Sequence, residues 1–241
     1  MTFLELCQAF VWEANIDRSG TARPVSVENQ VGDLESAVRW IRQAYIELQR
    51  SKTNWAFLRG EFALETVDGQ RKYAYGDCTD GGNPITRHAA WWLSDINNPP
   101  KCYLKSTGRG GEYFLTYQPR VYFNQLFNIG NNALAKSMPS NIAIDVDRGL
   151  LLGMTPNGVY VVTGEYQKSA QVLTANNDVP EMPADFHYLI VYEALRKYAA
   201  DDLAPEVLTR AETEGAALRN ALNRDQLPNP GDMDFAGRPL A

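Results

Sequence analysis

The chain of 241 residues is 44% hydrophobic and 22% charged, values typical of a globular protein with a substantial core and unlike those of a disordered chain. Its three cysteines form no CxxC pair, which argues against a disulfide framework and against a zinc site. The net charge of −6 is concentrated in residues 176–241, where 12 Asp and Glu side chains stand against 6 Lys and Arg, and this balance argues against a dedicated nucleic-acid-binding protein with a basic stripe.

Two helices are predicted before residue 54. The first covers residues 2–14, because Thr2 and Glu5 have the spacing of a capping box and apolar residues then recur at helical intervals. A loop follows, and Asp33 is expected to cap the second helix. Three large apolar residues lie off the two apolar stripes: Trp12, Trp40 and Ile46. We expect each of them either to pack against another segment or to face a neighbouring subunit.

The middle of the chain is predicted to be rich in β-strands, because the hydrophobic period changes from helical to alternating after Trp55. A hairpin is predicted around the turn pair Asp68-Gly69, followed by a loop at 76–83. Further short strands are predicted at 102–104, 113–117, 141–146, 150–152 and 159–166, with a glycine-rich hairpin turn at 106–111. Residues 119–140 fit a short helix as well as a strand with a loop, so their structure is left open.

The C-terminal part is predicted to contain two more helices and a tail. Residues 185–200 form a helix whose charged side chains fall in one narrow arc, so it needs partners on more than one side. Pro205 fits the first turn of the last helix. Residues 225–241 contain three prolines, two glycines and no periodicity, and are expected to be disordered or ordered only against a partner.

This layout predicts the α+β fold class. The apolar stripes of all four helices are buried most economically in one antiparallel helical bundle, formed by residues 1–54 and 176–224. Residues 55–175 would then be an inserted β-rich domain, and residues 225–241 an extended C-terminal tail.

No set of residues for catalysis converges in the sequence. The chain has only two histidines, His88 and His187, and it lacks a P-loop, a dinucleotide fingerprint, an HExxH pair and a Gly-x-Ser-x-Gly elbow. Asp145 and Asp147 have no further ligand at metal-binding spacing. We therefore expect no catalytic, cofactor-binding or metal-binding residues. Glycan hydrolysis stays open as an alternative, because paired carboxylates with an aromatic platform would support it and their geometry is invisible in a sequence.

The stretch from Gly149 to Ala200 resembles a known family. It contains a predicted hairpin GLLLGMTPNGVYVVTGEYQK, a connector LTANNDVPEMP and a helix that opens with DFHYLIVYEALRKYAA. This order is similar to the C-terminal half of the head-to-tail adaptor (connector) proteins of tailed bacteriophages, and the likeness extends to the N-terminal helices and from Trp55 onward. Members of that family place a small β-domain between the helices of a bundle, assemble as a ring beneath the portal and have no enzymatic activity.

The resemblance implies a structural virion protein of the portal vertex, or neck, that is made in the cytoplasm of a bacterial host. It implies a homo-oligomeric, twelve-fold ring that docks on the portal protein and joins the next tail component, a nozzle, tube or stopper. DNA would pass through the lumen without sequence-specific binding, which suits the acidic C-terminal region. No membrane anchor is expected, because no apolar run approaches the ~18 residues of a spanning helix. The alternatives are a virion-associated glycan-binding or glycan-hydrolysing tail protein and a neighbouring stopper or tail-completion protein.

Three groups of residues are assigned to contacts on this basis. The subunit interface is assigned to Trp12, Trp40, Ile46 and Trp55. The portal-contacting tail is assigned to Leu227, Pro228, Met233, Phe235, Arg238 and Leu240. The loops that face the tail are assigned to Trp91, Trp92 and Arg109.

Overall fold

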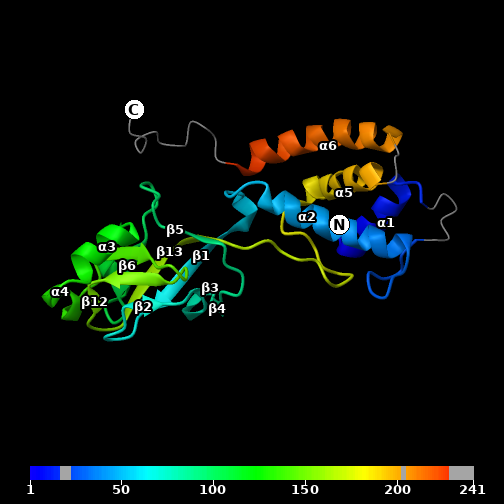
Figure 1. Cartoon of the computed structure of the whole chain (residues 1–241). Coiled ribbons are helices and arrows are strands. Elements are labelled where there is room, and N and C mark those ends of the chain that lie inside the picture. Colours follow the sequence, from blue (N-terminus) through cyan, green and yellow to red (C-terminus); the bar gives the residue numbers. More distant parts are fainter. Residues whose placement is uncertain (17–22, 202–204, 228–241) are drawn as a thin grey trace, which may run out of the picture. The chain divides into compact units, whose positions relative to one another are not determined.

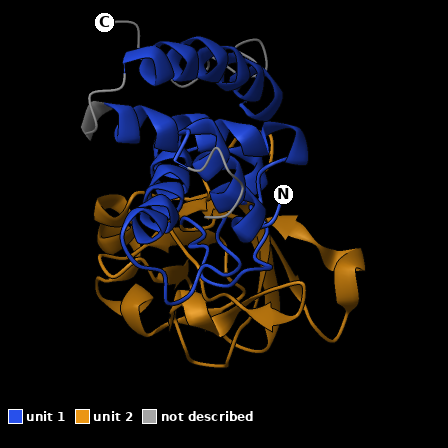
Figure 2. Cartoon of the chain, turned by 90° about the vertical axis from the view of Figure 1, so that its right-hand side faces the viewer, with its two compact units in different colours: residues 1–58, 170–241 blue, residues 59–169 orange. Residues whose placement is uncertain are grey.

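The computed structural model describes residues 1–16, 23–201 and 205–227 (Figure 1). The chain divides into two compact units: unit 1 comprises residues 1–58 and 170–241, and unit 2 comprises residues 59–169 (Figure 2). The mixture of helices and sheets confirms the predicted α+β class. The antiparallel bundle with an inserted β-rich domain stays a prediction.

Unit 1 is helical. Its helices are α1 (Phe3–Glu13), α2 (Asp33–Arg50), α5 (His187–Asp201) and α6 (Pro205–Gln226), with short 3-10 turns η1 (Ala56–Leu58) and η4 (Ala184–Phe186). The predicted capping box starts α1: the Thr2 hydroxyl accepts the Glu5 N–H at 3.3 Å, and the Glu5 carboxylate accepts the Thr2 N–H at 2.8 Å. Helix α2 is preceded by Gly32 at φ +63° as its N-cap, in place of the expected Asp33.

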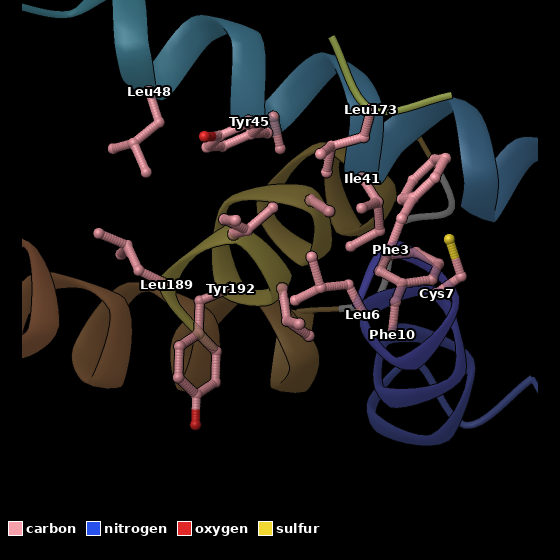
Figure 3. Packing of buried hydrophobic residues seen from close by; sticks show 14 of the residues in the cluster. Phe3, Leu6, Cys7, Phe10, Ile41, Tyr45, Leu48, Leu173, Leu189 and Tyr192 are labelled. Carbon is pink, nitrogen blue, oxygen red and sulfur yellow. The ribbon is translucent and has the colours of Figure 1, made fainter. Parts of the chain in front are cut away.

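The core of unit 1 is centred on α5, which contacts α1, α2 and α6. Figure 3 shows Leu6 of α1, Ile41 of α2 and Leu189 of α5 within one cluster of apolar side chains. The prediction that this helix has partners on more than one side is therefore confirmed. Trp55 and Leu173 belong to the same core. Residues 55–58 and 170–175, which the sequence assigned to the β-rich part, thus pack with the helices.

The polar connector before α5 is held against α2 by hydrogen bonds. The Tyr45 hydroxyl donates to the Gln171 side-chain oxygen at 2.8 Å. The Gln49 amide pairs with the Gln171 backbone in both directions, at 3.0 and 2.8 Å. Arg42 Nε donates to the Leu173 carbonyl at 2.8 Å. An unpaired polar group of the backbone is destabilising when it is buried. These hydrogen bonds therefore allow the extended connector to be buried against α2.

Unit 2 contains two larger sheets and a strand pair among its described residues. The seven-stranded sheet has the order β4-β3-β1-β13-β6-β7, with β5 also paired to β13. Its strands are β1 (Arg59–Glu65), β3 (Cys78–Asp80), β4 (Asn83–Pro84), β5 (Ala90–Trp92), β6 (Lys101–Leu104), β7 (Tyr113–Phe114) and β13 (Tyr160–Gln167). The four-stranded sheet has the order β2-β11-β10-β8, with β2 (Lys72–Tyr73), β8 (Thr116–Tyr117), β10 (Asn141–Ile144) and β11 (Leu150–Gly153). Strand β9 (Lys136–Ser137) pairs with β12 (Thr155–Pro156), and the helical segments are η2 (Tyr75–Asp77), η3 (Gly108–Gly111), α3 (Arg120–Phe127) and α4 (Asn131–Leu134).

Side-chain alternation arranges unit 2 in layers. Leu150 and Leu152 of β11 lie in the core that the two larger sheets share, whereas Leu151, between them, packs with α3. Phe123 and Phe127 are the α3 residues in that second cluster. Segment 119–140, which the sequence left open, therefore provides a helix that covers the outer face of the four-stranded sheet.

Two predicted hairpins are wrong, because their strands belong to different sheets. Strand β1, before Asp68-Gly69, pairs with β13, whereas β2, after this turn, pairs with β11. Likewise β11 and β13, within residues 149–168, lie in different sheets. The predicted loop 76–83 contains the small hairpin β3–β4. The turn at 106–111 is confirmed, since β6 and β7 on either side of it pair antiparallel.

Candidate interaction surfaces

Unit 2 exposes six apolar side chains on α3, on α4 and in the residues just after α3 and β9. The exposed fractions are 67% for Val121, 58% for Tyr122, 48% for Leu126, 63% for Ile129, 84% for Leu134 and 49% for Met138. We call these six residues the α3–α4 surface. Residues 113–144, which include it, contain no Asp or Glu. Single exposed apolar side chains are ordinary, but six within 18 residues mark a candidate protein-binding surface.

Arg71 fixes the segment that carries this surface. Its guanidinium donates to the side chains of Thr155 and Asn128 at 3.1 and 2.9 Å, and to the carbonyls of Phe127, Asn132 and Ala133 at 2.9, 3.0 and 3.4 Å. The Phe127 carbonyl belongs to the last turn of α3, where a cation also meets the negative end of the helix dipole. Burial lowers the pKa of Arg71, but an arginine remains charged at neutral pH.

Two further contacts seat α3 on the sheet. A Cβ added to Gly153 would lie 2.7 Å from the Phe127 ring, so the ring rests directly on the glycine backbone. At the other end of the helix, Arg120 Nε donates to Asp145 at 2.7 Å. Lys72 lies 2.6 Å from a carboxylate oxygen of both Asp145 and Asp147, so this acid pair holds an amine. The Lys72 hydrogen bond, ahead of other contributions, lowers the Asp145 pKa to about 2.

Unit 1 contains a hollow of about 600 Å³ beside Trp12. Its apolar lining comes from Trp12, Leu195 and Val207, and its charged lining comes from Glu13, Glu206 and Arg210. We call it the Trp12 hollow. The Trp12 side chain is 56% exposed, which fits the expectation of a large apolar residue off the main stripe.

Helix α6 is joined to α1 and α5 by a polar network at this hollow. The Tyr188 hydroxyl donates to Glu13 at 2.5 Å, and Arg210 lies 2.7 Å from the same carboxylate. The Tyr192 hydroxyl bonds Glu214, which also faces Arg210 at 3.5 Å. Burial, then the bond to Glu13, raises the pKa of Tyr188 far above its usual value. The hydroxyl therefore stays a donor, and the network fixes one wall of the hollow.

A second, polar depression of about 440 Å³ lies on the outer face of the seven-stranded sheet. Its lining includes Lys101 and Arg109, the latter assigned from the sequence to a loop that faces the tail. It also includes Glu61 and Glu165, which lie opposite each other on paired strands. Asn98 holds Glu165 with a 2.8 Å hydrogen bond. The aromatic residue that lines it, Phe62, is 2% exposed. The described lining residues thus offer no aromatic platform of the kind that the glycan alternative needs.

The other residues assigned to the subunit interface are more enclosed than Trp12. Trp40 is half-buried, with its ring centroid 5.9 Å from Phe10 and 5.4 Å from Tyr198, and Ile46 is half-buried on α2. Trp55 is 1% exposed, so its side chain fills the core of unit 1 and offers no surface to a neighbouring subunit. A tryptophan between a helix and a strand looks the same in sequence whether it fills the core of its own unit or faces a neighbouring subunit.

The three residues assigned to loops that face the tail differ in their exposure to solvent. Trp91 is 7% exposed and lies in β5, where its indole N–H donates to the Arg148 carbonyl at 2.7 Å, so it is a core residue of unit 2 and not a loop contact. Trp92 is half-buried, with the Arg59 guanidinium 4.1 Å from its ring centroid. Arg109 is exposed in η3.

The predicted tail lies mostly outside the described residues. Leu227 is partly buried against the core of unit 1. The other assigned positions are outside the described residues: Pro228, Met233, Phe235, Arg238 and Leu240.

Buried titratable groups in both units are held neutral. Burial raises the thiol pKa to about 12 for Cys7 and Cys78 and to about 11 for Cys102. Burial, assisted by the Arg148 charge, lowers the pKa of His88 to about 4. Burial also lowers the pKa of His187, whose Nε2 lies 2.9 Å from the Met182 carbonyl. These groups are therefore poor nucleophiles or bases at neutral pH.

The described ranges contain neither a metal site nor a membrane-spanning helix. In residues 1–16, 23–201 and 205–227, no three His, Cys, Asp or Glu side chains gather as a metal site. In the same residues, no helix combines the length and apolarity that a membrane crossing needs.

The α+β fold, with an exposed apolar surface, a hollow and no assembled catalytic set in the described residues, fits a protein that acts through contacts with other proteins. A model of the SU10 adaptor protein family matches residues 1–237. The chain belongs to this family, which confirms the resemblance to phage head-to-tail adaptors. No curated protein shows a significant match to the chain. Membership implies a bacteriophage structural protein of the virion neck that associates with portal and tail components, and it suggests a role without catalysis.

The α3–α4 surface and Arg71 were not predicted from the sequence. A usable signal was present, because residues 113–144 lack acidic side chains in a chain of net charge −6. Apolar residues in 121–129 also occupy more positions than one buried stripe requires. Nothing comparable marks Arg71, which in sequence is one charged residue next to a turn.

Proposed function

We propose that this protein is a head-to-tail adaptor that forms a twelve-fold ring beneath the portal, joins the capsid vertex to the tail and lets DNA pass through its lumen. The family match over residues 1–237 carries this proposal. A ring subunit needs two different surfaces that associate with a neighbour, and the α3–α4 surface and the Trp12 hollow are two candidates.

The two units are proposed to have different partners. The helices of unit 1, as an antiparallel bundle with the tail 225–241, dock on the portal, with Trp12, Trp40 and Ile46 toward neighbouring subunits. Unit 2, the inserted β-rich domain, faces the next tail component, to which Trp92 and Arg109 contribute. The excess of acidic side chains in residues 176–241 supports a lumen that repels DNA, since binding to the phosphate backbone depends on cationic side chains.

The proposal is tested by mass photometry of the purified protein, alone and mixed with the portal protein from the same genome. A species of one portal ring plus a full ring of this chain is expected. A variant that lacks residues 228–241 tests the tail, and this deletion retains Gln226, whose side chain accepts the Phe57 N–H at 3.0 Å. Loss of binding on deletion would assign the tail as a portal contact.

Two results would count against the proposal. Absence of portal binding by the full chain would refute the adaptor role and favour a stopper or tail-completion protein. Turnover of a cell-wall or capsular polysaccharide by the purified chain would favour the glycan alternative instead.

A further inference from the structure

Asn157 and Gly158 lie in the turn between β12 and β13, at the one place in the sequence where a glycine directly follows an asparagine. Such a pair can react with itself. The glycine nitrogen attacks the side-chain carbonyl carbon of the asparagine, ammonia leaves, and a cyclic succinimide forms. This route is one reason why asparagine is a thermolabile residue. The local structure of the turn decides whether the reaction is possible.

The nitrogen of Gly158 is available for the attack. The residue lies outside both strands, and no acceptor in residues 1–16, 23–201 and 205–227 bonds its N–H. The nitrogen must lose its proton as it attacks, and a hydrogen bond in a strand ladder would hold that proton. Glycine also has no Cβ to shield the nitrogen. Beyond the adjacent residues, a Cβ built at Gly158 would have Leu104 as its nearest neighbour, at 3.8 Å, so the position is uncrowded.

The side-chain carbonyl of Asn157 is polarised for the same reaction. Asn157 is an exposed residue, and the Tyr160 hydroxyl donates a hydrogen bond to its Oδ1 at 2.7 Å. The attack places negative charge on this oxygen, and a donor at the atom where charge develops stabilises the transition state. Burial raises the pKa of Tyr160 above its usual value, so the hydroxyl remains a donor at neutral pH.

We propose that Asn157 is a site of spontaneous deamidation in this protein. The Gly158 nitrogen forms a bond to Cγ of Asn157, the Cγ–Nδ2 bond breaks, and the proton of the Gly158 nitrogen leaves with the departing ammonia. Water then opens the succinimide at either carbonyl and gives an aspartate or an isoaspartate. Overall, water is consumed and ammonia is released. A neck protein is not replaced once the virion is assembled, so the products accumulate with time.

The isoaspartate product disturbs the start of β13. Its peptide bond runs through the side-chain carbon, so the main chain becomes longer by one methylene group. The Gly158 carbonyl accepts the Thr66 hydroxyl at 3.0 Å, and the oxygen of that hydroxyl accepts the Tyr160 N–H at 2.8 Å. Thr66 is 2% exposed, so loss of its bond to Gly158 leaves a buried polar group without an acceptor. Because β13 pairs with β1, β5 and β6, the change reaches the centre of the seven-stranded sheet.

Timed incubation of the purified full-length chain at neutral and mildly alkaline pH tests the proposal. The peptide that contains residue 157 is analysed by liquid chromatography and by mass spectrometry with electron-transfer fragmentation, which distinguishes aspartate from isoaspartate. Asn97 is the matched control, because it is exposed in the same unit but is followed by Asn98. Loss of the asparagine form is expected at 157 and not at 97, and it is expected to quicken as the pH rises. An intact Asn157, or equal loss at the two positions, would overturn the inference.

Two variants test the chemistry of the turn. Gly158→Ala is expected to fold, since its Cβ has room, and to suppress isoaspartate formation by shielding the nitrogen. Deamidation of this variant at the wild-type rate would refute the succinimide route. Tyr160→Phe removes the donor to Oδ1 and is expected to slow the loss of Asn157. A rate equal to or above that of the wild type would refute the polarising role of the hydroxyl.

The structural consequence is measured by urea denaturation of aged protein. Protein rich in isoaspartate is expected to unfold unit 2 at a lower urea concentration than fresh protein does. Asn157→Asp is the control, because it introduces the same charge and keeps the normal main chain. Equal midpoints for aged protein and for Asn157→Asp would show that the added methylene group does not disturb β13.

Discussion

Replacement of Arg71 by methionine is the sharpest test of how the α3–α4 surface is held. Methionine retains an apolar stem of similar length and removes every donor. The lost contacts are those to Thr155, Phe127, Asn128, Asn132 and Ala133. A hydrogen bond from a charged group contributes about 1.5–3 kcal/mol, but several of these acceptors regain water, so a total near 2–4 kcal/mol is expected.

The loss is measured in two ways. Urea denaturation of unit 2 reports the free energy of unfolding, and hydrogen exchange of peptides from residues 120–138 reports local opening. Exchange there is expected to accelerate by more than about tenfold, since 1.4 kcal/mol corresponds to a factor of ten. Arg109→Met is the matched control, because Arg109 is exposed. If both variants behaved alike in both measurements, Arg71 would not be the anchor of this segment.

Three other predictions concern local contacts. Gly153→Ala forces a Cβ toward the Phe127 ring and is expected to destabilise unit 2 by about 1–3 kcal/mol in urea denaturation. The pKa of Asp145 lies at about 2, below its ordinary 3.8, so its contribution is present above about pH 4 and is lost as the pH falls toward 2. Asp145→Asn is expected to flatten that part of the stability profile in thermal melts. Tyr188→Phe removes the donor to Glu13 and is expected to lower the stability of unit 1 by about 1 kcal/mol in thermal unfolding.

Each of these changes has a control in the same chain. Gly110→Ala adds a Cβ where nothing lies within 4 Å, and an equal effect at Gly153 and Gly110 would remove the packing argument. If the stability of Asp145→Asn fell with pH below pH 4 in the same way as that of the wild type, other carboxylates would determine the acid sensitivity. Tyr122→Phe changes an exposed tyrosine and serves as the reference for Tyr188→Phe.

Structural features that depend on residues close together in the chain could be predicted from the sequence. The capping box of α1 depends on residues three apart, and the extensive burial of α5 follows from the distribution of its charges. The class α+β and the family resemblance were likewise accessible. Each of these features is fixed by a pattern within one short window or by the order of such windows.

Strand pairing could not be predicted in the same way. The turn at Asp68-Gly69 and the alternation on either side predict a hairpin, yet the chain crosses from one sheet to the other there. Turn residues show where a strand ends, but the partner strand is chosen by burial against residues far away in sequence. For the same reason Trp55 and Trp91, which were assigned to surfaces, became core residues.

The ambiguity of residues 119–140 has a physical cause that bears on function. Phe123 and Phe127 face the four-stranded sheet, while Val121, Tyr122 and Leu126 are exposed on the same helix. Apolar residues on both sides of a short helix blur the helical period, because only three of its eight residues are polar. The sheet of its own unit covers one apolar side of this helix, and the other side stays open to a partner protein.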